Sequence, residues 1–219
     1  MTDAIAWVDD RKAIRRRFTK VLKKHLSGRW RIVVSGPLEN IGEYPSWIVD
    51  QGIAALVLDE RLGDRAESGS EHVDYEGHDV VEMLRAKMPT LPIFIVTAAP
   101  TSADLSEKFG DVEDVIARSD FADRASAYTS RIQRAASRYV EQNRERLSRM
   151  MELASKSVSE GLSTSEKEEL LSIRAYLEID GGFEHVDQDD LLRRAETVLQ
   201  DIESQLEALA ARTASDARE

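Results

Sequence analysis

The sequence predicts a doubly wound α/β domain, with a five-stranded parallel sheet, followed by an all-helical region. Through residue 120, short apolar runs typical of buried strands alternate with segments of helical periodicity. Beyond residue 120 the strand-like runs stop, while helix-like patterns continue. We therefore expect two parts, an α/β domain over residues 1–122 and a helical region over residues 123–219.

Five short runs are the predicted strands. They are rich in β-branched and aromatic residues, and polar residues, glycine or proline bound them. The third run is apolar throughout, which is typical of a strand covered on both faces of a parallel sheet. The runs are AIAWV (4–8), WRIVVS (30–35), AALVL (54–58), PIFIVTA (92–98) and DVIAR (114–118).

Helical segments are expected between these strands. Residues 11–26 and 78–88 place apolar side chains near one face of a helix, and residues 45–51 and 102–109 do so over shorter lengths. A strand-helix alternation of this kind is typical of a parallel sheet whose ligands bind at the carboxyl ends of the strands.

The helical region begins with a long predicted helix over residues 121–158, since no glycine or proline interrupts it. Asn143 lies on its apolar stripe, where a polar residue can set the register of paired helices or can equally face water. Gly161 is expected to end this helix. Ser163 or Ser165 can then cap the next one.

Two glycines, Gly181 and Gly182, are expected to end that second helix of the region. A last helix over residues 187–211 carries leucine, valine and isoleucine at coiled-coil spacing. Apolar stripes on three helices favour a hairpin or bundle that packs on itself or on a second copy of the chain.

Composition narrows the possible functions. The chain has 219 residues, a net charge of −11 and no cysteine, which excludes disulfides and thiolate metal sites. No apolar run is long enough to span a membrane, and no basic-then-apolar signal peptide is present, so we expect a cytoplasmic protein without membrane contact.

An acidic chain is a poor general binder of nucleic acid. Residues 11–31 are locally basic, either as a solvated helix face or as a docking face for an acidic partner or for the chain's own acidic half.

Polar side chains stand at the ends of four predicted strands: Asp9 and Asp10, Asp59, Thr97 and Arg118. Because the carboxyl ends of parallel strands meet at one edge, these residues should surround one small volume. Three carboxylates so close repel one another unless a cation lies among them, and oxygen ligands favour Mg²⁺. One carboxylate could then attack phosphorus, while the hydroxyl and the fixed cation stabilise phosphoryl oxygens.

On this pattern, residues 3–125 resemble the CheY-like receiver domain of two-component response regulators. The motifs that carry the resemblance are WVDD, LVLDERLG, GHDVVEMLR, PIFIVTA and VIARSDF, in order along the chain. The resemblance implies a flavodoxin-like receiver fold for this part of the chain.

The resemblance also implies roles for single residues. Asp59 would accept the phosphoryl group, and Thr97 would bond a phosphoryl oxygen. Mg²⁺ would be held by Asp9, Asp10 and Asp59, with Asp9 acting partly through water, and by the backbone carbonyl of Arg61.

The chain departs from the family at three places. Arg118-Ser119 stands where the family has Lys-Pro, and a wide planar guanidinium is no conservative replacement for a compact ammonium. Val115 occupies the place of the switch aromatic. The loop over residues 63–79 is long and acidic.

These departures leave alternatives for each candidate residue. The acids can belong to a receiver that is no longer phosphorylated, with Arg118 permanently paired to Asp59, and Thr97 can serve only as a hydrogen-bonding strand end. His72 and His78 in the long loop can join a metal site or simply be solvated.

The resulting hypothesis is an atypical response regulator: a phospho-accepting signalling protein, not an enzyme, with a helical dimerisation or output region and no DNA-binding domain. Expected partners are a sensor histidine kinase or a small phosphodonor, a second copy of the chain, and a protein bound through the C-terminal helices. The alternative is a phosphorylation-independent pseudo-receiver that serves as a scaffold or adaptor.

Overall fold

A computed structural model describes residues 3–63, 73–98 and 109–180 of the chain. Three predicted features lie outside these residues: His72 in the long loop, the helix expected at 102–109 except for its last residue, and everything from Gly181 onward, including the expected last helix.

Five parallel strands form a single sheet in the order β2-β1-β3-β4-β5. This confirms the predicted doubly wound domain, and the order is that of the flavodoxin-like fold. The strands are β1 (Ala4–Val8), β2 (Arg31–Ser35), β3 (Ile53–Asp59), β4 (Ile93–Thr97) and β5 (Asp114–Ala117).

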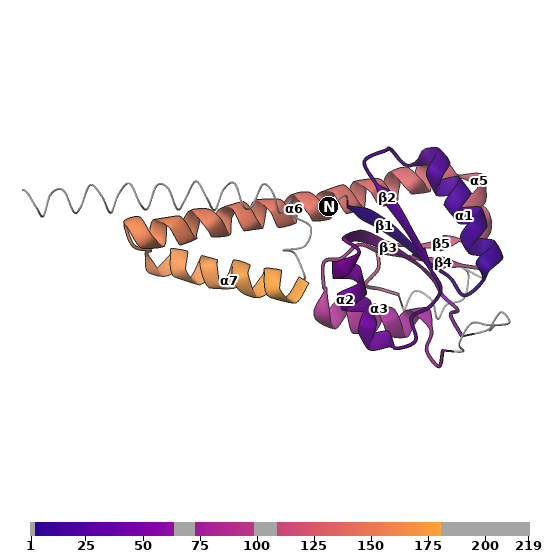
Figure 1. The fold of residues 1–219 in the computed structure, drawn as a ribbon, viewed down its shortest axis with the longest axis horizontal. Helices are drawn as coiled ribbons and strands as arrows, with labels where there is room; N and C mark the ends of the chain where they lie inside the picture. Colours follow the sequence, from indigo (N-terminus) through magenta and orange to yellow (C-terminus); the bar gives the residue numbers. More distant parts are fainter. Residues whose placement is uncertain (1–2, 64–72, 99–108, 181–219) are drawn as a thin grey trace, which may run out of the picture.

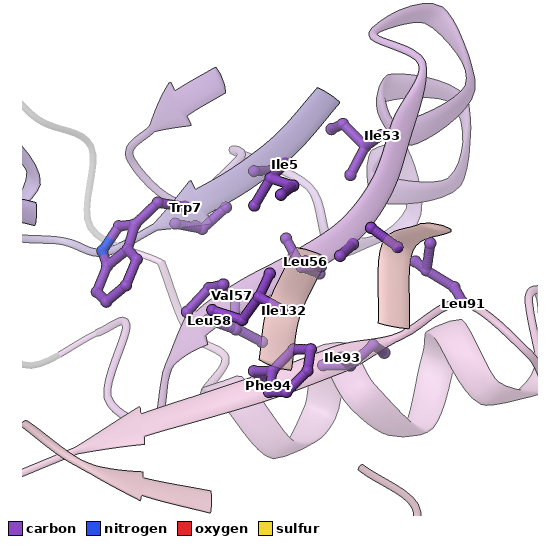
Figure 2. Packing of buried hydrophobic residues seen from close by; sticks show 14 of the residues in the cluster. Ile5, Trp7, Ile53, Leu56, Val57, Leu58, Leu91, Ile93, Phe94 and Ile132 are labelled. Carbon is purple, nitrogen blue, oxygen red and sulfur yellow. The ribbon is translucent and has the colours of Figure 1, made fainter. Parts of the chain in front are cut away.

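The central strands β1, β3 and β4 are buried at every residue, whereas β2 and β5 at the edges are partly exposed. This is the burial expected of strands that helices cover on both faces. Figure 2 shows side chains of these three strands in the core, with Ile132 of a later helix packed among them.

Helices cover the two faces of the sheet. The helix α1 (Lys12–His25) lies on one face, beside the start of the long helix α6 (Ala125–Ser159). The helices α2 (Tyr44–Asp50) and α3 (Gly77–Lys87) lie together on the other face (Figure 1). A short 3₁₀ turn, η1 (Ile41–Glu43), precedes α2. All three helices fall within two residues of the predicted ranges.

The predicted helix over residues 121–158 is wrong at its start. The structure has a short helix, α5 (Arg118–Asp123), and then α6 (Ala125–Ser159), with Arg124 between them at φ −118° and ψ 32°. The physical reason is the burial of Phe121, whose ring lies 5.4 Å from that of Trp7 and 5.0 Å from that of Phe18. The chain turns once this ring is in the core.

The first half of α6 belongs to the core of the sheet domain. Ile132, Ala136, Tyr139 and Val140 are buried in the same hydrophobic cluster as the strands. The predicted division between residues 122 and 123 therefore passes through one continuous cluster.

The second half of α6 forms a hairpin with α7 (Thr164–Asp180) (Figure 1). Gly161, at φ +79°, turns the chain where the sequence predicted the break. Ser163 and Glu166 form a capping box, since the backbone N–H of each donates to the other's side chain. A small cluster around Leu147 and Leu177 holds the pair together.

Asn143 neither faces water nor lies on an exposed seam. It is fully buried within the chain, and Arg146 donates a hydrogen bond of 3.2 Å to its Oδ1. The Arg146 guanidinium also lies 3.8 Å from the ring centre of Tyr176 in α7.

Among the described residues, no helix combines the length and the apolarity that crossing a membrane requires.

Candidate functional site

Three aspartates meet at the carboxyl edge of the sheet. Asp9 and Asp10 follow β1, and Asp59 is the last residue of β3, the strand paired with β1. Each offers a carboxylate oxygen, and these oxygens all lie within 4.8 Å of one another. All three side chains are buried, with Asp9 at 0% and Asp59 at 2% exposure. The sequence-predicted cluster is thus assembled as expected.

The cluster fits a hard divalent cation. Asp9 Oδ2 and Asp59 Oδ2 are buried and accept no hydrogen bond from the described residues. Buried carboxylate oxygens without a donor favour a cation among them, and an all-oxygen set suits Mg²⁺. Arg61 lies two residues beyond Asp59 at the same edge, and its backbone carbonyl as a further ligand stays a prediction.

Arg118 forms the ion pair with Asp59 that the sequence left open. It begins α5 directly after β5, and its side chain is 15% exposed. Its Nη2 lies 2.5 Å from Asp59 Oδ1 and 3.9 Å from Asp9 Oδ2. The charge at the end of β5 therefore reaches the central carboxylate.

Thr97 is buried at the end of β4, and its hydroxyl donates a hydrogen bond to the carboxylate of Glu60. Glu60 follows Asp59 directly. The hydroxyl thus lies at the predicted edge, and it binds the neighbour of the candidate phosphoacceptor in this structure.

Two arginines near the start of α1 were missed: Arg11, the residue before the helix, and Arg15 within it. The Arg11 guanidinium lies 3.6 Å from Asp59, 3.5 Å from Asp10 and 3.9 Å from Asp9. Arg15 Nη1 donates to the backbone carbonyls of Asp9 and Asp10, at 2.5 and 2.9 Å. In the helix predicted over residues 11–26, directly after the acid pair, their four-residue spacing puts both on one side, and this was a signal that could have indicated their role.

Burial controls the acidity of the cluster. Burial, reinforced by the charge of Asp9 and opposed by Arg11, raises the pKa of Asp59 to about 8. Burial likewise raises the pKa of Asp9 to about 6, against hydrogen bonding and charge from Arg11. Both carboxylates are therefore costly to ionise unless more positive charge is supplied.

The close approach of α3 fixes the end of β3. The Gly77 N–H donates to the Glu60 carbonyl at 2.8 Å, and a Cβ on Gly77 would lie 2.4 Å from the Asp59 carbonyl oxygen. Only glycine allows this contact without a shift of the backbone. Glu76 holds the same loop from the other side by accepting from the Leu62 N–H at 2.8 Å.

Two further predicted positions are His78 and Val115. His78 is on α3, where its Nε2 lies 3.2 Å from Asp79 Oδ1, and the metal-ligand group found among the described residues consists of the three aspartates. Val115 is half-buried in β5, opposite Ile95 of β4.

Comparisons with known proteins add a likeness in fold. No protein-family model and no curated protein matches the sequence. Solved structures similar to this chain include the non-phosphorylated HemR receiver domain of Leptospira biflexa, at 20% identity and a TM-score of 0.45, covering 62% of this chain and 94% of that one.

Two other similar structures are of response regulators. RcsB of Salmonella typhimurium has 15% identity and a TM-score of 0.47, covering 83% of this chain and 93% of that one. TrrA of Thermotoga maritima, in complex with Mg²⁺ and beryllium fluoride, has 17% identity and a TM-score of 0.42, covering 59% and 98%. By its own strand order, the described chain has the doubly wound flavodoxin-like fold, which receiver domains share, and a helical hairpin extends it.

Proposed function

We propose that this chain is an atypical response regulator that accepts a phosphoryl group on Asp59 and relays the change through its helices. One observation carries the proposal: three buried aspartates surround one point at the carboxyl edge of the sheet, and a guanidinium pairs with the central one. This donor set suits a cation and a phosphoryl group together.

The transfer itself needs few protein groups. A carboxylate oxygen of Asp59 attacks phosphorus, and the bond from phosphorus to the donor's leaving group breaks as that group departs with its electron pair. Mg²⁺, held by Asp9, Asp10, Asp59 and the Arg61 carbonyl, would favour ionised Asp59 and neutralise charge on the phosphoryl oxygens.

Two side chains would change partners. Arg118 would move from Asp59 Oδ1 to a phosphoryl oxygen, since its guanidinium already lies at that carboxylate. The Thr97 hydroxyl would leave Glu60 and bond another phosphoryl oxygen. Both exchanges replace a contact within the chain by a contact to the new group.

The path to the helices starts at Arg118. It is the first residue of α5, and Phe121, three residues later, packs against Trp7 and Phe18 in the core and stacks on Tyr128 of α6. A shift of Arg118 would therefore move α5 and the start of α6. This route from the site to the helices needs no aromatic residue at the position of Val115.

We further propose a cytoplasmic homodimer, built through residues 123–219, that receives phosphoryl groups from a sensor histidine kinase or a small phosphodonor. Its output would be a protein bound through the helices, with no DNA-binding and no enzymatic activity beyond its own phosphorylation and dephosphorylation. Sedimentation velocity of the full chain, with and without phosphodonor, measures whether assembly follows phosphorylation.

The proposal is tested by incubating the full chain with Mg²⁺ and acetyl phosphate and recording its intact mass. We expect one added phosphoryl group in the wild type and in Asp50→Asn, a control acid exposed at the end of α2, and none in Asp59→Asn. Folded protein that gains no phosphoryl group would contradict the proposal. The alternative, a phosphorylation-independent scaffold with Arg118 locked on Asp59, would then hold.

A further inference from the structure

Arg11 occupies a position that the proposed reaction does not use. Its guanidinium contacts all three carboxylates of the cluster, whereas Arg118 contacts Asp59 and Asp9. The oxygens nearest to Arg11 are one from each aspartate: Asp9 Oδ1, Asp10 Oδ1 and Asp59 Oδ2. A cation that binds one oxygen of each carboxylate would approach the same volume.

Arg11, Arg15 and Arg118 are held differently at the cluster. Arg15 is tied to two backbone carbonyls, and Arg118 makes a short contact of 2.5 Å with Asp59. The Arg11 guanidinium lies 3.5 to 3.9 Å from its carboxylates, beyond hydrogen-bonding distance, and is 32% exposed. The Arg11 side chain is therefore held mainly by charge, and part of it is exposed to solvent.

The backbone of Arg11 is fixed independently of its side chain. Its N–H donates to Asp9 Oδ1 at 2.9 Å, and α1 begins at the next residue. The side chain can thus leave the cluster without removing this support from Asp9.

Resting on the proposed function, we propose that Arg11 is an internal cation of this site, that Mg²⁺ binds only by displacing its side chain, and that Arg11 thereby sets the Mg²⁺ concentration the protein needs. Mg²⁺ requires oxygens at about 2.0–2.1 Å. A divalent ion at that distance and a guanidinium facing the same three carboxylates would repel each other strongly. Arg11 is thus a positioning and regulatory residue, and it takes no part in the transfer.

The test measures Mg²⁺ binding by titration calorimetry on the full chain, without phosphodonor. Arg11→Ala is compared with Arg16→Ala, which removes the same charge from an exposed position on α1. We expect the dissociation constant for Mg²⁺ to fall at least about fivefold in Arg11→Ala relative to Arg16→Ala. Arg11→Lys, which keeps the charge, should return it toward the wild-type value. Circular dichroism confirms that each variant is folded.

Each outcome decides a separate claim. Equal affinity in the two alanine variants, or weaker binding by Arg11→Ala, would overturn the role of Arg11 while leaving the metal site intact. Binding that survives in Asp10→Asn would place the ion elsewhere and overturn the inference. Absence of Mg²⁺ binding in the wild type and in every variant would contradict the metal site of the proposed function itself.

Discussion

Asp9 is the residue at which burial and charge oppose each other most plainly. It is 0% exposed, its Oδ2 accepts no hydrogen bond from the described residues, and its pKa is raised to about 6. One pKa unit corresponds to about 1.4 kcal/mol, so ionised Asp9 destabilises the metal-free fold by roughly 1–3 kcal/mol. The neutral amide of Asp9→Asn keeps the oxygen that accepts from Arg11.

We therefore expect Asp9→Asn to raise the free energy of unfolding at pH 7.5 without Mg²⁺, by about 1–3 kcal/mol. The same variant should lose the stabilisation that Mg²⁺ gives the wild type, because a ligand is gone. Urea unfolding with and without Mg²⁺ measures both effects. A variant less stable than the wild type in metal-free buffer would show that the carboxylate is favourable where it lies.

The pH dependence of metal-free stability follows from the same residues. The pKa values of Asp9 and Asp59 are about 6 and about 8 in the folded chain, against 3.8 for an ordinary aspartate. The folded chain therefore binds more protons than the unfolded chain between about pH 4 and pH 8, and stability falls as pH rises through that window.

We expect the wild type to lose more stability between pH 5 and pH 8.5 than the double variant Asp9→Asn/Asp59→Asn, by on the order of a few kcal/mol. The difference cancels the titration of groups elsewhere in the chain. Urea unfolding at each pH supplies the numbers. Parallel curves for the two proteins would mean that these carboxylates keep ordinary pKa values.

At the residue scale, the site residues that could be predicted from the sequence are those at the ends of strands. Asp59 and Thr97 end β3 and β4, and Arg118 follows β5, and a parallel sheet brings such strand ends to one edge. Arg11 and Glu60 were missed because their contacts depend on where long side chains point. Strand-end reasoning does not fix that direction.

At the scale of elements, the join of β3 to α3 depends on Gly77. A Cβ there would lie 2.4 Å from the Asp59 carbonyl oxygen and 3.0 Å from that of Glu60, and backbone atoms cannot yield as a flexible side chain can. Added side-chain volume would push α3 away from the strand that carries Asp59.

We expect Gly77→Ala to lower the free energy of unfolding by about 1–3 kcal/mol and to weaken Mg²⁺ binding, because the end of β3 shifts. Gly28→Ala is the control, since a Cβ at Gly28 has nothing within 4 Å. Thermal unfolding and calorimetry give the two readouts. Equal behaviour of the two variants would show that α3 accommodates the methyl group freely.

The first half of α6 belongs to the core of the sheet domain, and its second half pairs with α7. Its residues Ile132, Tyr139 and Val140 are buried on the sheet, and α6 contacts both α1 and β3. A chain that ends at residue 122 loses these side chains and exposes the sheet face that they cover. A chain that ends at residue 159 keeps them.

We expect the chain 1–159 to unfold cooperatively and the chain 1–122 to lack a stable fold, because losing even one large buried side chain costs about 2–5 kcal/mol of a total near 5–15. Ile132→Ala in the full chain should cost about 2–5 kcal/mol. Circular dichroism with heating compares the two truncations. A stable 1–122 chain would contradict the assignment of α6 to the core.

The elements differ in how visibly the sequence marks them. The five strands and Gly161 were predictable, since β-branched apolar runs and a glycine break are local signals. The turn at Arg124 was not, because the burial of Phe121 against Trp7 and Phe18 causes it, and no local signal marks it.

On the scale of the whole molecule, α6 connects the two ends of the sheet domain. It has 35 residues and is therefore roughly 50 Å long. It starts just after α5, whose first residue contacts Asp59, and its far half carries α7. The Tyr176 hydroxyl of α7 contacts the Thr90 hydroxyl, just before β4 begins, at the edge opposite the acid cluster. Through α5, α6 thus links the acid cluster to the hairpin.

The proposed phosphorylation switch depends on Asp59 being the phosphoacceptor, and trapping its acyl phosphate is the most direct test. The full chain is treated with acetyl phosphate and Mg²⁺ and then with borohydride, which reduces an aspartyl phosphate to homoserine, and peptide mass spectrometry reads residue 59. We expect homoserine at position 59. Unchanged aspartate there in folded protein, or a phosphoryl group trapped on another residue, would contradict it.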